Sequence, residues 1–475
     1  MKREGSYVVL TEVEYSDLEL LIKTLGSSSS KLEAKVIDLE TRIKELEGQL
    51  KKDSSNSSKP PSSDGYKKRG VILNNREKSE KKQGAQPGNL GNSLKMIALS
   101  DKVVEHKVEG YCVCGQNLQE LLAHDVQVRQ VIDLPEKLTE VTNHMVEIKQ
   151  CVCGLKHEAK CEVTHGVQYG TRLKSLGVYF TQYQHIPFGR TQEIMAEIFG
   201  VNISDGTLVD SNKACYDFLQ ETEDQIKQAL LKSPVIHNDE TGMRCDGSLH
   251  WVHSTSTSTH THYALDKKRG APAMDKIGVL PNYTGVSIHD RWASYDSYNC
   301  VHGLCNAHLL RELKYIHQQE DKQWAKQMID LLVQANNQKK ENKLDTITTN
   351  LILLSYQEII QQAKLQEPQI NPPPEKKRGR IKKTKSLNLL ETFTNRKEQI
   401  LLFVTNKQVP FDNNLAERDL RMVKLKQKIS GCFRTNNGAQ LFCRIRSYIS
   451  TVRKQGHSVI QAINLALNQN PINVA

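Results

Sequence analysis

The chain has 475 residues and a formal net charge of +11, from 65 Lys and Arg against 54 Asp and Glu. This length predicts several domains, and a clustered positive excess favours a polyanionic partner. Aromatic residues make up only 6% of the chain, which argues against base stacking as the main binding mode. No apolar run matches a membrane span and no signal-peptide pattern is present, so we expect a cytoplasmic protein without a membrane partner. The eleven cysteines are then expected to be metal ligands or buried thiols rather than disulfides.

Residues 1–52 are expected to form a helix and a coiled coil. Apolar residues recur there at steps of four and three, the a/d seam of a heptad repeat. A single amphipathic helix lying on its own domain has the same pattern, but the next segment, residues 53–95, is rich in Ser, Pro and Lys and is expected to be a disordered basic linker. That linker fits a solvated connector and a phosphate-tracking arm equally well. The seam residues are Leu32, Val36, Leu39, Ile43, Leu46 and Leu50.

Two CxCG motifs mark residues 96–165 as a candidate zinc-binding domain. Cys112 and Cys114 belong to the first motif and Cys151 and Cys153 to the second, with strand-like alternation between them. Four thiolates gathered at one metal form a common structural Zn²⁺ site. A small β-rich domain with unligated thiols is the alternative, because paired cysteines in zinc knuckles are more often two residues apart.

Residues 166–228 have the spacing of a helix-turn-helix. Gly200 is expected to end a first amphipathic helix, and Ser204 can cap a second one. Helix, short turn and helix is the pattern of a DNA-binding module, in which Arg190 and Thr207 are the candidates for DNA contact. An ordinary helical hairpin has the same spacing. The apolar residues of the two helices are Ile194, Ile198, Phe199 and Leu208.

The chemistry is expected in a set of strands that begins at "PVIHNDE". This buried strand is predicted to end in Asp239 and Glu240, and "LHWVHSTST" and "THYAL" follow it as a meander. "TGVSIHDRWASY" is a second apolar strand followed by Asp290, and "NCVHGLCNAHLLREL" is a strand that runs into a helix at His308. Carboxylates at the ends of adjacent strands converge, as a Mg²⁺ or Mn²⁺ site requires.

A third carboxylate is expected on the helix that follows Pro410. Two cations about 3.5–4 Å apart can activate an attacking oxygen and stabilise a leaving one, and two aspartates are a sparse ligand set for them. Asp412 or Asn413 can cap this helix, Asp419 lies well round it, and Glu417 is the candidate ligand. A solvated helix whose acids pair with its bases is the alternative. The basic residues expected to hold phosphates are Arg418, Arg421, Lys424 and Lys426.

Nearly the whole chain resembles the transposases of the insertion sequence 66 family, DDE transposases with a ribonuclease-H-like core. The motifs that carry the resemblance occur in the family's order. They are "NSSKPPSSD", the CxCG pairs, "VQYGTRLKSLGVYFTQYQHIPFGRT", "NDETGMR", "HDRWASY", "CNAHLLREL" and "PFDNNLAERDLRMVKLKQKISGCFRT".

The resemblance implies a catalytic triad, namely Asp239 of "DET", Asp290 of "HDRW" and Glu417 of "NNxxER". His308 and Arg311 of "CNAHLLREL" are expected to position substrate or carboxylate, although a purely structural helix start is at least as compatible with them. The implied fold is multidomain α+β, with a ribonuclease-H-like α/β core at residues 229–455, a helical and basic insertion at about 317–399, and a C-terminal helix and tail at 456–475.

The implied function is that of a bacterial, nucleoid-associated DNA transposase. It is expected to bind the terminal inverted repeats of its element, to cleave DNA with Mg²⁺ or Mn²⁺ by two-metal-ion chemistry, and to join the freed 3′-hydroxyl to target DNA. A homodimer or larger synaptic oligomer is expected because two element ends must meet, and small companion proteins from the same element are possible partners. A non-catalytic repressor or decayed copy, and a nuclease without strand transfer, are the alternatives.

Overall fold

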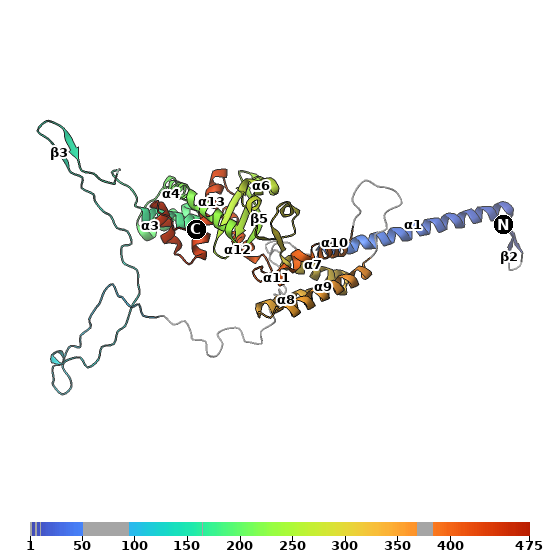
Figure 1. Ribbon diagram of the computed structural model, residues 1–475, viewed down its shortest axis with the longest axis horizontal. Helices are drawn as coiled ribbons and strands as arrows, with labels where there is room; N and C mark the ends of the chain where they lie inside the picture. The colour runs from blue at the N-terminus through green and yellow to red at the C-terminus, as the bar shows by residue number, and fades with distance from the viewer. Residues whose placement is uncertain (1, 5–6, 10, 51–94, 164, 368–382) are drawn as a thin grey trace. The chain divides into compact units, whose positions relative to one another are not determined.

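The computed structural model describes residues 2–4, 7–9, 11–50, 95–163, 165–367 and 383–475 (Figure 1). The described residues divide into two compact units. One holds the N-terminal helix, residues 171–187 and the chain from 209 onwards; the other holds residues 95–170 and 188–208. The protein is therefore an α+β protein whose sheet lies entirely in the first unit.

A mixed five-stranded sheet forms the centre of the first unit, in the order β7-β6-β5-β8-β9. The first three strands in the chain pair antiparallel, while β8 pairs in parallel with β5 and β9 in parallel with β8. The predicted meander and the two later strands are confirmed. The strand bounds are β5 Val235–Cys245, β6 Ser248–Ser256, β7 Thr261–Asp266, β8 Val286–His289 and β9 Val301–Leu304.

The prediction that the first strand ends at Asp239 and Glu240 is wrong. β5 continues to Cys245 because β6 pairs with it along its whole length, from His237 opposite Ser256 to Cys245 opposite Ser248. The parallel partner β8, by contrast, pairs with β5 only as far as His237. Asp239 therefore lies inside a strand, at the level where the parallel neighbour ends.

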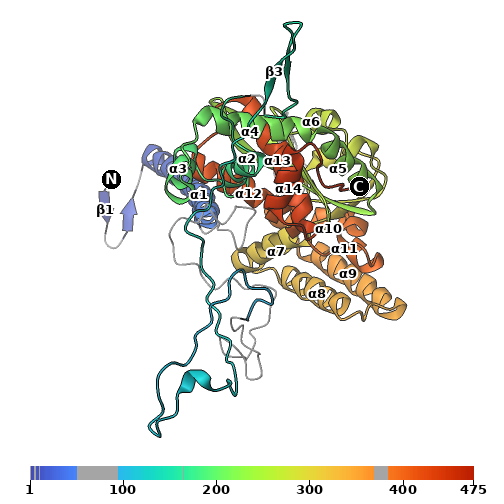
Figure 2. The ribbon, with the colours of Figure 1, turned by 90° about the vertical axis from the view of Figure 1, so that its left-hand side faces the viewer.

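Helices cover the sheet and bury its apolar side chains. α12 packs on β5 and β6, and α13 packs on β7 and also contacts α5 and α14 (Figures 1 and 2). The predicted C-terminal helix is confirmed as α14. These elements are α2 Thr171–Val178, η3 Tyr179–Tyr183, α5 Gln220–Lys232, α6 Ala271–Ile277, η4 Leu280–Asn282, η5 Ala293–Ser297, α12 Asn414–Ser430, α13 Asn436–Lys454 and α14 Val459–Leu467.

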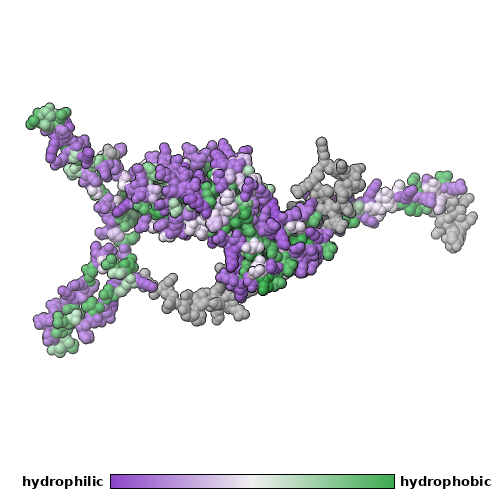
Figure 3. All heavy atoms as spheres, in the orientation of Figure 1, coloured by the Kyte–Doolittle hydropathy of each residue, from purple (hydrophilic) through white to green (hydrophobic). Residues whose placement is uncertain are grey.

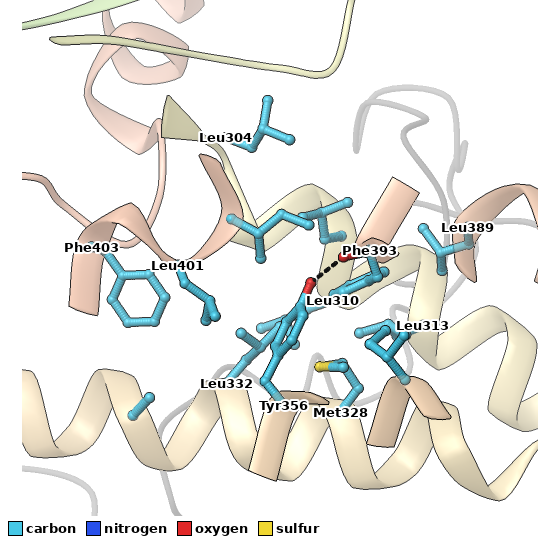
Figure 4. Packing of buried hydrophobic residues seen from close by; sticks show 14 of the residues in the cluster. Leu304, Leu310, Leu313, Met328, Leu332, Tyr356, Leu389, Phe393, Leu401 and Phe403 are labelled. Atoms are coloured by element: carbon cyan, nitrogen blue, oxygen red, sulfur yellow. Dashed lines mark hydrogen bonds between the residues drawn. The ribbon is translucent and has the colours of Figure 1, made fainter. Parts of the chain in front are cut away.

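The segment between the second aspartate and the Glu417 helix is helical, as predicted. Its helices gather into one bundle (Figure 2) around buried Trp324 and Tyr356, and the Tyr356 hydroxyl donates a hydrogen bond of 2.7 Å to the carbonyl of Phe393 (Figure 4). Most of the predicted basic loop lies outside the described residues. The helices are α7 Asn306–Glu320, α8 Gln323–Lys340, α9 Thr346–Gln366, α10 Lys385–Asn395 and α11 Lys397–Thr405.

Hydrophobic surface remains over this bundle in the space-filling view (Figure 3). On α9 the side chains of Ile347, Leu351 and Leu354 are exposed. They recur at steps of four and three and so share one helix face.

The N-terminal segment is a hairpin of β1 (Lys2–Glu4) and β2 (Tyr7–Val9) followed by the 39-residue helix α1 (Glu12–Leu50). Every residue of the predicted heptad seam is exposed in the single chain, from 45% for Leu46 to 85% for Leu50. Among the described helices, none is long and apolar enough to cross a membrane.

The second unit holds little regular structure outside its helices. The strand-like alternation between the CxCG motifs does not produce the predicted strands: only β3 (Ile148–Gln150) pairs, with β4 (Lys156–Glu158), and both are exposed. Apolar alternation needs a partner surface to bury one face, and these apolar side chains remain exposed in the described chain. The 3₁₀ turn η2 (Leu118–Glu120) is the other regular element of this segment.

The predicted helix pair is present as α3 (Phe188–Phe199), which lies in this unit, and α4 (Asp205–Phe218), which begins in this unit and continues in the first. Gly200, with φ +66°, follows α3, and the Ser204 hydroxyl accepts from the Thr207 N–H at 3.2 Å to cap α4. The predicted buried face is partly wrong, since Ile198 is 54% exposed and the buried residues of α3 are Thr191 and Met195.

Candidate active site

The register of the sheet brings Asp239 and Asp290 together. The last parallel pair of β5 and β8 is His237 opposite Ile288, and each aspartate follows its member of that pair by two residues. Because side chains alternate along a strand, both carboxylates leave the same face at the same level. They are neighbours where the two strands part.

Asn238 holds the backbone immediately before Asp239. Its side-chain nitrogen donates to the Ser287 hydroxyl of β8 at 2.9 Å, and its side-chain oxygen accepts from the Thr255 hydroxyl of β6 at 2.8 Å. Buried side-chain bonds to both neighbouring strands fix β5 at this point.

Glu417 is placed by a contact between its helix and β5. Asn413, at the start of α12, donates from its side chain to the carbonyl of Asn238 at 2.8 Å, and its side-chain oxygen shares a 2.8 Å hydrogen bond with His237 Nδ1. Its backbone N–H donates to the Cys305 thiol at 3.2 Å. Glu417 follows one turn later, so the first turn of α12 is attached to the strand that carries Asp239.

The three carboxylates interact through space. Burial raises the pKa of Asp239 well above its usual value, and the charges of Glu240, Glu417 and Asp290 raise it further. Negative groups that repel each other in a partly buried place favour a bound cation, which removes the repulsion.

His308 and Arg311 of α7 flank Glu417 without hydrogen-bonding to it. Glu417 Oε1 lies 3.8 Å from His308 Nδ1 and 3.9 Å from Arg311 Nη2. Both Oε1 and Nδ1 are buried and have no hydrogen-bond partner among the described residues. Burial lowers the pKa of His308, and the Arg311 charge lowers it further, so the imidazole is neutral at neutral pH and is free to donate or to ligate.

Glu417 and His308 belong to the one group of potential metal ligands found in the described part of the chain. Their ligand atoms and the Cys305 sulfur lie within 4.8 Å of one another. Burial raises the pKa of the Cys305 thiol to about 12, which keeps it protonated and unsuited to a hard cation. Glu417, with His308 beside it, is the part of this group that fits Mg²⁺ or Mn²⁺.

Glu240, next to Asp239, has a structural partner that the sequence did not reveal. Arg269 donates to one Glu240 oxygen from Nε at 2.9 Å and Nη2 at 2.7 Å, and the Tyr295 hydroxyl donates to the other at 2.5 Å. The guanidinium lies 4.8 Å and 4.2 Å from the ring centroids of Trp251 and Trp292. Glu240 therefore braces the loop after Asp290, and only the three-dimensional contact identifies Arg269.

The basic residues of α12 do not form one surface. Arg418, Arg421 and Lys424 are all exposed, but Lys424 donates to the carbonyl of Gly242 at 2.6 Å. Lys426 follows Glu417 by about two and a half turns and so faces the opposite side of the helix. Arg418 and Arg421 are the two of these four that are exposed and have no hydrogen bond to another described residue.

The other predicted DNA contacts and the CxCG cysteines lie in the second unit. Arg190 pairs with Glu193 at 2.6 Å, and the Thr207 hydroxyl lies 3.0 Å from that of Ser204. Each CxCG closes a tight turn, in which the N–H of Gly115 or Gly154 donates to the carbonyl of the first cysteine at 2.8 Å.

Thiolate chemistry is favoured in both turns. The backbone N–H of Gln116 lowers the pKa of the Cys114 thiol, and that of Cys153 lowers the pKa of the Cys151 thiol. In the described residues the two cysteine pairs do not come together as a group of three or more ligands.

The sheet order, with helices on both its antiparallel and parallel parts, is consistent with the ribonuclease-H-like class of core. Residues 166–441 match the model of the family described as Transposase IS66 family, and the chain belongs to that family. Membership implies DDE transposase function, which is polynucleotidyl transfer on DNA with a divalent metal. Residues 10–95 match a family of unknown function, DUF6444. No curated protein matches the chain.

Proposed function

We propose that the protein binds the terminal inverted repeats of its insertion sequence and uses Asp239, Asp290 and Glu417 to cleave the element ends and join them to target DNA. The observation that carries the proposal is the convergence of these carboxylates at the point where β5 and β8 part. One oxygen of Glu417 has no hydrogen-bond partner there among the described residues. Divalent cations bound by such carboxylates activate water or a 3′-hydroxyl and stabilise the leaving oxygen.

The protein's own groups would orient the reaction. Asn413 and Asn238 hold the carboxylate-bearing elements together, while Arg418 and Arg421 would hold phosphates of the DNA backbone. His308 and Arg311, beside Glu417, would act as positioning residues for the carboxylate or the scissile phosphate. Cleavage and joining are both displacements at phosphorus, so one site can serve both steps.

The test is incubation of the full chain with labelled element-end DNA in Mg²⁺ or Mn²⁺, followed by denaturing electrophoresis. Metal-dependent nicks at the element end together with joined products support the proposal. Cleavage without joined products would replace it with a nuclease function. Binding without cleavage, even with companion proteins supplied, would replace it with a repressor function.

Self-association through α1 is part of the proposal, because the heptad seam is exposed in the single chain. We expect Leu39→Glu to convert a dimer or larger oligomer into a monomer in analytical ultracentrifugation, since a buried charge at a seam position opposes pairing. Ala34→Glu adds the same charge on the outer face and should leave the oligomer intact. A wild-type monomer at assay concentrations would reject self-pairing and leave companion proteins as partners of α1.

The CxCG turns are proposed to bind structural Zn²⁺ through their four thiolates, because both turns favour thiolates and have the same backbone form. Elemental analysis of the purified chain should find zinc that Cys112→Ser lowers strongly. Cys432→Ser, another exposed cysteine, should retain it. Equal zinc in both variants would exclude the CxCG site.

The α3–α4 pair is proposed as the helix-turn-helix that reads the element ends, with Arg190 and Thr207 at its DNA side. Its cap and turn geometry support the proposal. Footprinting should show Thr207→Ala weakening protection of the element end more than that of unrelated DNA, and equal weakening on both would remove the sequence-reading role.

A further inference from the structure

A second cluster of charge lies on the side of α12 that faces away from the carboxylates. Its members are Lys426 of α12, Arg446 and Arg453 of α13, and His185 and Tyr183 of the segment after α2. His185 and Arg446 are 1% and 3% exposed, Tyr183 and Lys426 are half-buried, and Arg453 is exposed. The cluster therefore has two buried members, two half-buried members and one exposed member.

The buried arginine makes few of the bonds it is able to make. The Arg446 guanidinium lies 5.3 Å from the Tyr183 ring centroid, and Nη1 donates a long, 3.4 Å hydrogen bond to the Tyr183 carbonyl. Its Nε is buried and has no partner in the part of the chain that the structure describes. Arg453 approaches the same ring at 6.0 Å.

His185 is the second buried member of the cluster. Its ring packs 5.8 Å from that of Phe442, and neither nitrogen has a hydrogen-bond partner among the described residues. Burial lowers the pKa of His185 to about 4, and the positive charges of Arg446 and Lys426 contribute to this shift. The imidazole is therefore neutral at neutral pH, with one N–H to donate.

The charge of Asp419 acts on Arg446, but no carboxylate of the described residues is hydrogen-bonded to Lys426, Arg446 or Arg453. The nearby Asp419 already accepts from Lys454, Ser256 and Thr261, and none of Lys426, Arg446 and Arg453 is found in an ion pair. A buried charge without a partner is strongly unfavourable, so such an arrangement points to an anion that completes it. Arg and Lys donors converging on one place match phosphate oxygens.

We propose that Lys426, Arg446 and His185 form a phosphate-binding site that takes a backbone phosphate of DNA at a second position, across α12 from the carboxylate site. The assignment of DNA as the source of the phosphate rests on the proposed function. The site adds a contact that holds a stretch of DNA other than the one cleaved.

The test measures affinity of the full chain for fluorescent duplex DNA by anisotropy, in EDTA, over a series of NaCl concentrations. Each lost phosphate contact reduces the slope of log K against log salt by about 0.9. We expect Lys426→Ala to reduce the slope by about that amount. Lys364→Ala, which removes the same charge from an exposed position on α9, away from α12, should leave it unchanged. Equal slopes for wild type and Lys426→Ala, or equal losses in both variants, would overturn the site.

A second variant separates a ligand-binding role from a structural one. Because apolar replacement of an unpaired buried charge is often neutral or stabilising, Arg446→Met should keep or raise Tm while weakening DNA binding. A lower Tm with unchanged DNA affinity would make Arg446 structural and overturn the proposal. Inorganic phosphate could instead be the ligand. If it raises the Tm of the wild type but not of Arg446→Met, and the two proteins have the same salt slope for DNA binding, DNA is overturned as the source of the phosphate.

These measurements do not depend on cleavage. Glu417→Gln should retain the wild-type salt slope, so loss of cleavage and loss of this phosphate contact are scored separately. A protein that cleaves and joins DNA but shows no Lys426 effect would keep the proposed function and lose this inference.

Discussion

Replacing Glu417 with Gln is expected to lower metal-dependent DNA cleavage by at least about a thousandfold while DNA binding persists. The change keeps the shape of the side chain and removes the charge that would hold the cation beside Asp239 and Asp290. Because Asn413, not Glu417, attaches α12 to β5, the fold should be unaffected. Single-turnover cleavage of labelled element-end DNA gives the rate, and anisotropy in EDTA gives the affinity.

The matched control is Asp412→Asn, which also removes one negative charge at the start of α12. Asp412 accepts from the backbone and side chain of Asn414 at 3.1 and 2.7 Å, bonds that an asparagine oxygen can partly replace. Its cleavage rate should stay within a few-fold of wild type. Comparable losses in both variants would mean that net charge, not a specific ligand, supports cleavage; an active Glu417→Gln would remove Glu417 from the site.

Replacing Asp419 with Ala is expected to lower the free energy of unfolding by about 3–5 kcal/mol. Asp419 accepts from Lys454 Nζ at 2.7 Å, Ser256 Oγ at 2.7 Å and Thr261 Oγ1 at 3.1 Å, and joins α12 to β6, β7 and α13. Both members of the ion pair are mostly buried, with 15% and 17% of the side chains exposed. Removal of the carboxylate leaves Lys454 charged and unpaired. Urea denaturation of the wild type and the variant measures the difference.

The double variant Asp419→Ala/Lys454→Met tests the cause. If the unpaired lysine dominates the loss, the second substitution should restore part of the stability, and the coupling free energy follows from the four proteins. Additive losses would instead assign the effect to the hydroxyl bonds of Ser256 and Thr261. In either case Asp419 is a fold-stabilising carboxylate, in agreement with its exclusion from the predicted ligand set.

Local pattern was sufficient for much of the fold. Apolar alternation predicted β6 and β7, short apolar runs predicted β8 and β9, and helical periodicity predicted α8, α9 and α14, because each signal lies within one element. The same local signals failed between the CxCG motifs, where the alternating apolar side chains remain exposed and few strands form.

For the candidate site, too, local pattern predicted some features and not others. Spacing placed Asp290 directly after a strand and Glu417 in the first turn of a helix, and the family resemblance selected them, with Asp239, from the other acids. Spacing alone favoured a solvated charged helix for Glu417, since no local signal distinguishes a ligand from an ion-paired acid.

By itself, then, the sequence determined many of the strands and helices and the family, and, through the family resemblance, the carboxylates proposed for catalysis. The tertiary structure alone decided how far β5 extends, since pairing with β6 sets its end. It also decided that Arg269 braces Glu240 and that the charges of Lys426 and Arg446 act on His185. Each of these depends on contacts between residues far apart in the chain, and periodicity within a short segment contains no information about such contacts.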